Sequence, residues 1–182
     1  MQKLKKYLFV LSIAGIASAG CKQPAAGSRR PAEAAVAAGE IGSHLPVFVV
    51  KDLQGRKISS ADVLGKIVLI DFWATWCQPC RKEMPGYQAL LDQYGPRGFA
   101  VIGFKLDTMA DPEDPLEFAY KIGVRYPLAA GSDDVKQKFG GIEGLPTTLL
   151  YDRQGILRKK VIGFESTEAF ESAVKQLLSA PN

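Results

Sequence analysis

Two cysteines separated by two residues are the side chains in this sequence best suited to chemistry. Cys77 and Cys80 flank Gln78 and Pro79. On one helical turn this spacing brings the two sulfurs close enough to form and break a disulfide locally. A cysteine at a helix N-terminus is also driven towards the thiolate by unpaired N–H groups and by the helix dipole. The spacing therefore predicts thiol–disulfide exchange, with Cys77 at the exposed end as the nucleophile and Cys80, one turn deeper, as the resolving thiol.

The two cysteines lie where a predicted strand gives way to a predicted helix. Residues 66–73 form a nearly continuous apolar run, which is typical of a strand buried on both faces. Apolar residues then recur at helical spacing until Gly95 and Pro96, which end the predicted helix. A second buried strand is expected at residues 99–104, so the strand–helix–strand order implies a parallel pair. A C-x-x-C motif in such a unit is typical of redox proteins.

The rest of the chain predicts a single α/β domain over residues 41–182. A short hairpin comes first, two short helices follow the second buried strand, and a second hairpin leads to a final helix capped by Ser166. The expected ranges are 48–58 for the first hairpin, 115–122 and 132–139 for the helices, and 147–151 with 156–164 for the second hairpin. The predicted elements thus place both cysteines at one end of a sheet.

The first 40 residues predict export rather than catalysis. Residues 1–20 carry three lysines and then an uncharged run of about 13 residues, shorter than the ~20 that span a bilayer, which is typical of a signal peptide. Residues 18–21 (Ser-Ala-Gly-Cys) resemble a bacterial lipobox, which predicts a lipid anchor on Cys21. The alternative is cleavage after Ala19, which would release a soluble periplasmic protein. Residues 21–40, rich in alanine with Pro and Gly, are predicted to form a flexible tether.

Charge balance and a shortage of ligand side chains exclude two classes of function. The chain has 23 Lys+Arg against 19 Asp+Glu, and three of the lysines lie in the predicted signal peptide. The domain therefore has no surplus of positive charge for binding a nucleic acid. We predict no metal and no cofactor, since only Cys21 and His44 could add ligands to the Cys77–Cys80 pair. A permanently closed structural disulfide remains an alternative, although so short a loop constrains little of the unfolded chain.

Two separated segments resemble a known family. Residues 72–85 (FWATWCQPCRKEMP) resemble the active-site signature of TlpA/ResA-type thioredoxin-like proteins, and residues 144–148 (GLPTT) resemble their cis-proline segment. The resemblance extends over residues 41–176 and implies a thioredoxin-like fold with an N-terminal β-hairpin and a helical insertion before the cis-proline hairpin. It also implies that Pro146 is cis, and that Trp76 and Leu145 help to form the substrate groove.

Two acidic residues near the cysteines are candidates for proton transfer. Asp71, six residues before the first cysteine, matches the buried carboxylate that relays protons to the resolving cysteine in thioredoxins. Glu83, three residues past the second cysteine, matches the acid of ResA-like members, many of which carry Asn where this chain has Asp71. If both acids face the thiols, their repulsion leaves one protonated near neutral pH, which suits acid–base catalysis. The alternatives are a structural role for Asp71 and, for Glu83, a solvent-exposed position paired with Arg81 or Lys82.

The resemblance implies an extracytoplasmic thiol–disulfide oxidoreductase that reduces the disulfides of exported partner proteins through the Cys77–Cys80 dithiol. Members of the family serve in cytochrome c maturation, which makes apocytochrome c a candidate substrate. A membrane protein of the DsbD or CcdA type is the expected electron donor. The expected location is the cell envelope, with the domain anchored by lipid and facing the periplasm or extracytoplasmic side.

Three other functions use the same two thiols. The oxidising direction of exchange requires the same residues and stays open. A thiol peroxidase on this fold would place Thr three residues before the reactive cysteine, where this chain has Ala74. A copper-handling chaperone would add a histidine after the hairpin and a wider cysteine spacing, and this sequence has neither feature.

Overall fold

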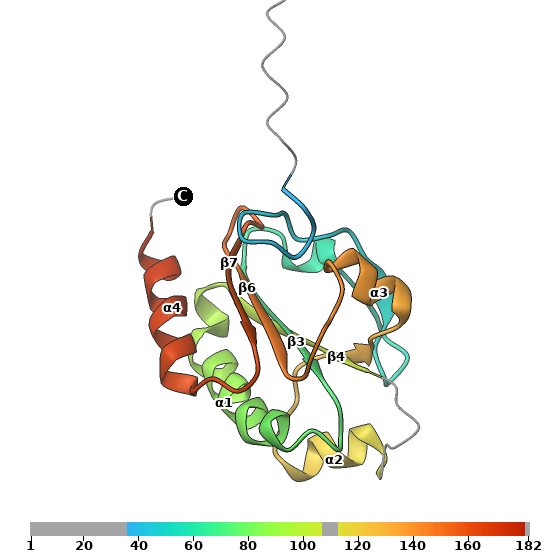
Figure 1. Cartoon of the computed structure of the whole chain (residues 1–182). Coiled ribbons are helices and arrows are strands. Elements are labelled where there is room, and N and C mark those ends of the chain that lie inside the picture. Colours follow the sequence, from blue (N-terminus) through green and yellow to red (C-terminus); the bar gives the residue numbers. More distant parts are fainter. Residues whose placement is uncertain (1–35, 107–112, 181–182) are drawn as a thin grey trace, which may run out of the picture. The chain divides into compact units, whose positions relative to one another are not determined.

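The computed structural model describes residues 36–106 and 113–180, which form a five-stranded sheet covered by helices on both faces (Figure 1). The strands lie in the order β5-β4-β3-β6-β7. β3, β4 and β5 run parallel to one another, β6 is antiparallel to β3, and β7 is antiparallel to β6. Their bounds are Ile67–Trp73, Phe99–Lys105, Leu128–Ala130, Thr147–Tyr151 and Leu157–Ile162 for β3 to β7.

Helices α1 (Gln78–Tyr94) and α4 (Thr167–Ser179) cover one face of the sheet, and α3 (Asp133–Lys138) lies on the other (Figure 1). Helix α2 (Pro115–Lys121) packs its Phe118 into the core beneath α1 and α4. Two short 3-10 turns, η1 (Ser60–Val63) and η2 (Gly95–Arg97), join the elements. The order of layers is that of an α/β sandwich.

Strand β3 is buried along its whole length and divides two hydrophobic cores. Ile67, Leu69 and Trp73 pack beneath α1 and α4, whereas Val68 and Phe72 belong to the core on the α3 side. Successive side chains of a strand point to opposite faces, so a central strand with helices on both sides must be apolar throughout. This confirms the interpretation of residues 66–73 as a strand buried on both faces.

The N-terminal hairpin, formed by β1 (Val49–Lys51) and β2 (Lys57–Ser59), protects one edge of the sheet. The Leu53 N–H donates to the Leu128 carbonyl over 2.7 Å, and Asp52 forms an isolated bridge with Ala129. The hairpin therefore covers part of the edge of β5. An uncovered edge would offer free backbone groups to another chain.

The two predicted hairpins, the four helices and the buried strands are confirmed, and Ser166 caps α4 as expected. Strand β5 was not predicted, because the sequence analysis placed only helices between β4 and the second hairpin. It has three residues between Pro127 and Gly131, too few to show a strand pattern in the sequence. Its strand character comes from pairing with β4.

The end of the predicted tether packs against the segment that follows α3, and the residues just after it are hydrogen-bonded to β7. Gly42 N–H donates to the Leu157 carbonyl, and Ala38 and Gly39 pack closely against the backbone at Phe139 and Gly140. The folded region therefore includes residues 38–40, just before the predicted boundary. The predicted signal peptide, Cys21 and most of the tether lie outside the described residues. None of the helices in the described part of the chain combines the length and apolar character of a membrane span.

Candidate active site

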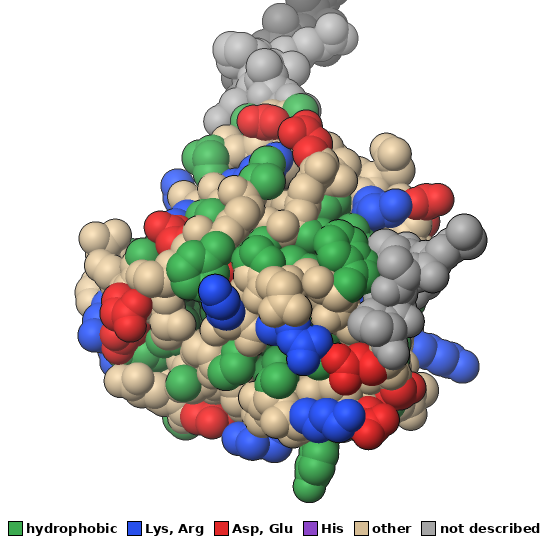
Figure 2. Space-filling view, turned by 60° about the horizontal axis from the view of Figure 1, so that its bottom comes forward, with side chains coloured by type: hydrophobic (Ala, Val, Ile, Leu, Met, Phe, Trp, Pro, Cys, Tyr) green, Lys and Arg blue, Asp and Glu red, His purple; other side chains and the backbone are tan. Residues whose placement is uncertain are grey.

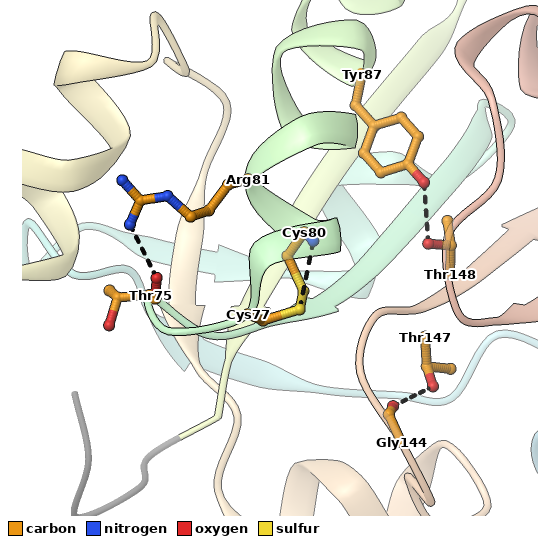
Figure 3. The surroundings of a disulfide bond; sticks show 8 residues. All are labelled: Thr75, Cys77, Cys80, Arg81, Tyr87, Gly144, Thr147 and Thr148. Atoms are coloured by element: carbon orange, nitrogen blue, oxygen red, sulfur yellow. Dashed lines mark hydrogen bonds between the residues drawn. A yellow bond between two sulfur atoms is a disulfide. The ribbon is translucent and has the colours of Figure 1, made fainter. Parts of the chain in front are cut away.

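Cys77 and Cys80 form a disulfide at the N-terminus of α1, directly after the end of β3 (Figure 3). Cys77 is the N-cap residue, and its sulfur accepts a hydrogen bond from the Cys80 N–H over 3.3 Å. Pro79 occupies the first turn, where its missing N–H has no helical partner to lose. The sulfur of Cys77 thus meets one of the N–H groups at the helix N-terminus, the kind of group that the sequence analysis expected to favour a thiolate.

Both cysteines are buried in this disulfide form, with Cys77 2% and Cys80 0% exposed. The expectation that Cys77 lies at an exposed end is therefore wrong for the oxidised state. The reason is local, because the Cys77 sulfur turns inward to bond Cys80 and to accept its N–H. Cys77 still lies one turn nearer the helix tip than Cys80, which leaves its predicted role as nucleophile untested.

Arg81 holds the loop that precedes the disulfide. Its guanidinium donates to the Thr75 carbonyl over 3.1 Å (Figure 3) and to Glu113 Oε1 over 2.8 Å, and it lies 4.5 Å from the centre of the Phe118 ring. One side chain thereby joins the loop before Cys77, helix α1 and the residues that open α2. These charge-assisted contacts restrain the loop that leads to Cys77.

The peptide bond between Leu145 and Pro146 is cis, as the resemblance implied. Thr147 pairs with Phe72 in the sheet, which places this loop beside the end of β3 and near the disulfide (Figure 3). The Pro146 carbonyl accepts the Gly163 N–H over 2.8 Å, and Thr147 Oγ1 donates to the Gly144 carbonyl over 2.7 Å. The loop is therefore tied to β7 and to itself.

Figure 2 shows hydrophobic side chains gathered on the face of the domain that comes forward from the bottom of Figure 1. Trp76, next to the reactive Cys77, is 44% exposed. Ile162 and Phe164, at the end of β7 that pairs beside the cis-proline loop, are also exposed, and Leu145 is half-buried. Apolar groups of this size at the surface are typical of contact sites for other proteins.

Asp71 is completely buried in the middle of β3, and neither of its carboxylate oxygens has a hydrogen-bond partner in the described residues. Burial raises the pKa of this carboxyl well above its ordinary value, and the charge of Glu83 raises it further. Both causes favour the protonated form of Asp71 relative to an exposed aspartate.

Glu83 is only 1% exposed, so the alternative of a solvated Glu83 paired with Arg81 or Lys82 is wrong. It lies on the inner face of α1, while Arg81 on the outer side pairs with Glu113. Burial raises the pKa of Glu83 to about 8, opposed by the nearby Glu165 backbone and Tyr87 hydroxyl. The charge of Glu83 also raises the pKa of Asp71, so the two buried acids repel each other as expected, while their part in proton transfer to the cysteines stays a prediction.

Two tyrosines lie close to these acids, and the sequence analysis did not identify either as part of the site. The Tyr87 hydroxyl is 3.1 Å from Thr148 Oγ1, which connects α1 to β6 (Figure 3). Tyr126 is 3% exposed, and its hydroxyl has no partner among the described residues. Helical spacing of four residues from Glu83 could have indicated Tyr87. Nothing in the sequence around Tyr126 connects it to the cysteines.

His44 lies away from the disulfide. It forms a bridge with Ile156, at the start of β7, whereas the cis-proline loop adjoins the opposite end of that strand. Within residues 36–106 and 113–180, no three His, Cys, Asp or Glu side chains are grouped so that they could hold a metal ion.

Comparison with known proteins agrees with this geometry. The model of the AhpC/TSA family matches residues 41–160. The thiol-disulfide oxidoreductase ResA of Bacillus thuringiensis (strain Al Hakam) is 37% identical over 141 residues, covering 76% of this chain and 79% of that protein. The thioredoxin-like protein YneN of Bacillus subtilis (strain 168) is 30% identical over 131 residues, covering 71% and 76%.

The fold has a close counterpart among solved structures. The crystal structure of a thiol:disulfide interchange protein of the thioredoxin family from Chlorobium tepidum TLS superposes with a TM-score of 0.69 and 28% sequence identity. It covers 78% of this chain and 100% of that chain. Because the family model matches most of the chain and ResA is 37% identical over 141 residues, this chain belongs to the AhpC/TSA family and is a thioredoxin-like thiol–disulfide oxidoreductase similar to ResA.

Proposed function

We propose that this oxidoreductase reduces disulfides of exported proteins on the outer side of the cytoplasmic membrane. The observation that carries the proposal is the Cys77–Cys80 disulfide at the N-terminus of α1 with two buried, unpaired carboxyls behind it. The predicted signal peptide supports the location, and the similarity to ResA supports the reducing direction. The disulfide form described here is then the product of one turnover.

In the proposed reaction the Cys77 thiolate attacks one sulfur of the partner's disulfide. The partner's S–S bond breaks, its other sulfur leaves as a thiolate, and a mixed disulfide joins the partner to Cys77. Cys80 then loses its proton and attacks the Cys77 sulfur, which forms the Cys77–Cys80 bond and releases the partner's second sulfur. Two electrons pass from the protein dithiol to the partner, whose two thiolates take up protons.

Asp71 or Glu83 accepts the proton of Cys80 in this scheme. The raised pKa of a buried carboxyl lies closer to the pKa of a thiol than the pKa of an exposed carboxyl does. This favours proton transfer, because general acid–base catalysis is most efficient when the pKa of the catalytic group lies near the working pH. The two carboxyls repel each other, so they titrate as a pair rather than singly. The pair can return the proton when the disulfide is reduced again.

The partner chain is proposed to bind between Trp76 and the cis-proline loop. Leu145 is half-buried, and no hydrogen bond to its backbone is present in the described residues. An extended segment around the partner's cysteine could therefore pair with the Leu145 backbone while its side chains contact Trp76 and Phe164. This supports a protein substrate rather than a small disulfide.

The similarity to ResA and the predicted signal peptide also support a proposal for the partners, the electron donor and the membrane anchor. We propose apocytochrome c among the partners, a membrane protein of the DsbD or CcdA type as the electron donor, and a lipid anchor on Cys21. The balance of the reaction requires a two-electron donor, since each turnover leaves Cys77 and Cys80 oxidised, and a dithiol of the proposed membrane protein would supply both electrons. A donor in the membrane would be within reach of a domain tethered there.

Trapping of the mixed disulfide tests the proposed function. A Cys80→Ser variant lacks the resolving thiol, so it should accumulate covalent complexes with its partners in the cell envelope, identified by mass spectrometry. Dithiothreitol should cleave the mixed disulfides and release the partners. The partners should be exported proteins, with cytochrome c precursors among them. Cys77→Ser should yield none. Ordinary turnover by the Cys77→Ser variant would refute the assigned roles, and complexes made only with cytoplasmic proteins would refute the location.

A further inference from the structure

Several buried polar atoms beside the active site lack hydrogen-bond partners among the described residues. They are both carboxylate oxygens of Asp71, both of Glu83, the indole Nε1 of Trp73 and the hydroxyl of Tyr126. Two of these groups, Trp73 Nε1 and the Tyr126 hydroxyl, can donate a hydrogen bond, and the carboxylates can accept one. Unpaired polar groups in an interior are costly, and buried water bridges such groups in most proteins.

Gly103 brings three of these groups together. It is the register partner of Asp71 in the parallel pairing of β3 and β4, so the two residues present the same face of the sheet. A Cβ atom on Gly103 would lie 2.6 Å from Leu128 Cδ2, 3.1 Å from Trp73 Nε1 and 3.2 Å from Cε2 of the Tyr126 ring. The Trp73 and Tyr126 rings therefore pack over Gly103 together with the Leu128 side chain, on the face of the sheet that Asp71 also presents.

The backbone around Tyr126 is held firmly. Its N–H and that of Arg125 both donate to Oε1 of Gln88 on α1, over 3.1 and 2.8 Å. The carbonyl of the next residue, Pro127, accepts the Gly103 N–H over 2.9 Å. Contacts on both sides of Tyr126 thus fix the ring against β4 and α1.

We propose that Tyr126 is a positioning residue for Asp71, whose carboxylate receives the Tyr126 hydroxyl's hydrogen bond through a buried water that Trp73 Nε1 also contacts. Such a water has three polar partners, within the usual number for a buried water. The inference rests on the proposed role of Asp71 as a proton acceptor for Cys80. It adds a residue from a loop that carries no part of the two-cysteine motif.

The physical effect is on the charge state of Asp71. A hydroxyl donor stabilises an ionised carboxylate more than a protonated one, so it offsets part of the burial and of the Glu83 charge that raise the pKa of Asp71. The other groups facing Asp71 are Glu83 and Tyr87 from α1, and Thr148, its register partner on β6. Lys105 lies on the same face two residues beyond Gly103, and Glu165 faces Glu83.

The test compares two substitutions that each remove a single buried hydroxyl. Tyr126→Phe keeps the ring beside Gly103 and deletes only the proposed donor. Tyr151→Phe is the matched control, since the Tyr151 hydroxyl is also buried without a partner in the described chain but belongs to the core on the other face of the sheet. Titration of the Asp71 carboxyl is followed by carbon-13 NMR in the oxidised, full-length protein.

Tyr126→Phe should raise the titration midpoint of Asp71 by about one pH unit, the size expected for one lost hydrogen bond to a charged group. Tyr151→Phe should leave it unchanged. An unchanged midpoint in Tyr126→Phe, or an equal shift in both variants, would overturn the proposal. Both substitutions are small enough that a folded protein is expected, and the NMR spectrum itself verifies this.

A kinetic measurement separates this inference from the proposed function. Glutathione is attached to Cys77, and its displacement by Cys80 is followed against pH. Tyr126→Phe should move the profile to higher pH by the same amount as the Asp71 midpoint. If Asp71→Asn leaves the profile unchanged, Asp71 is not the base and the proposed proton transfer fails, whereas the NMR titration still decides whether Tyr126 acts on Asp71.

Discussion

Glu83 makes the folded protein's stability depend on pH. Its pKa is about 8 in the fold against an ordinary value of 4.5, because burial disfavours the charged carboxylate. A carboxyl whose pKa rises on folding binds a proton more tightly in the folded state, so its contribution is most favourable below pH 4.5. That contribution declines as the pH rises from 4.5 to 8 and stays constant above.

Glu83→Gln should therefore flatten the pH dependence of unfolding. We expect the oxidised variant to be more stable than the parent by roughly 2–4 kcal/mol at and above pH 8 and to differ little near pH 4.5. Urea unfolding across this pH range measures the difference. Glu143→Gln, at an exposed loop residue, is the control and should match the parent throughout. If the stability difference between Glu83→Gln and the parent did not grow between pH 4.5 and pH 8, the raised pKa assigned to the buried Glu83 would be contradicted.

The parts of the site that could be predicted lie close together in the chain. Asp71, Cys77, Cys80 and Glu83 fall on one strand and one helix, so helical and strand spacing alone places them together. Tyr126 comes from a distant loop and reaches Asp71 only because β4 pairs with β3 at Gly103. Register between strands is a property of the folded sheet, and a single sequence does not reveal it.

At the scale of elements, helices α1 and α4 approach closely at Gly86. A Cβ on Gly86 would lie 1.9 Å from Oγ1 of Thr167 and 3.0 Å from its Cβ and Cγ2. Gly86 lies in the interior of α1. At such a position alanine normally stabilises a helix by up to ~1 kcal/mol relative to glycine. The close approach reverses that preference, since overpacking at a fixed contact costs about 1–3 kcal/mol.

Gly86→Ala should thus destabilise the protein by about 1–2 kcal/mol in urea unfolding. Thr167→Ala removes the two atoms of Thr167 beyond Cβ, so adding it to Gly86→Ala should recover part of that loss, which a double-mutant cycle detects. Gly95→Ala is the matched control at the end of α1, since its Cβ would meet only Leu91 Cδ1 at 3.4 Å. Equal effects of Gly86→Ala and Gly95→Ala would show that the α1–α4 contact can relax.

Element prediction succeeded where a segment carries its own signals. α1 begins at an N-cap cysteine with proline in the first turn, and α4 at a serine whose hydroxyl accepts the Ala169 N–H. β5 has no such signal, because three residues of Leu-Ala-Ala are equally compatible with a helix. Its pairing with β4 and the cover supplied by the N-terminal hairpin make it a strand. The short elements at sheet edges are therefore decided by the tertiary fold.

At the scale of the whole molecule, the described residues contain every group that the proposed reaction uses. Cys77, Cys80, Asp71, Glu83 and the cis-proline loop all lie between residues 71 and 146. Residue 42 is already hydrogen-bonded to β7, so the domain is attached at its N-terminal side to the edge of the sheet. We therefore expect the preceding segment to determine where the domain is located and to take no part in the exchange reaction. Location and chemistry should therefore be separable by mutation.

Cys21→Ser tests that separation. Without the sulfur that would carry the lipid, the variant should move from the membrane fraction to the soluble envelope fraction, because diacyl and acyl chains provide firm anchoring that a tether alone does not. The purified variant should reduce a model protein disulfide at the parent's rate, since Cys77 and Cys80 are untouched. In cells, the variant should reduce its exported partners more slowly. A domain released from the membrane loses the high effective concentration that a tethered domain has near its membrane-bound electron donor. Unchanged membrane association would instead show that Cys21 is not the anchor, and a slower purified enzyme would show that the N-terminal segment takes part in exchange.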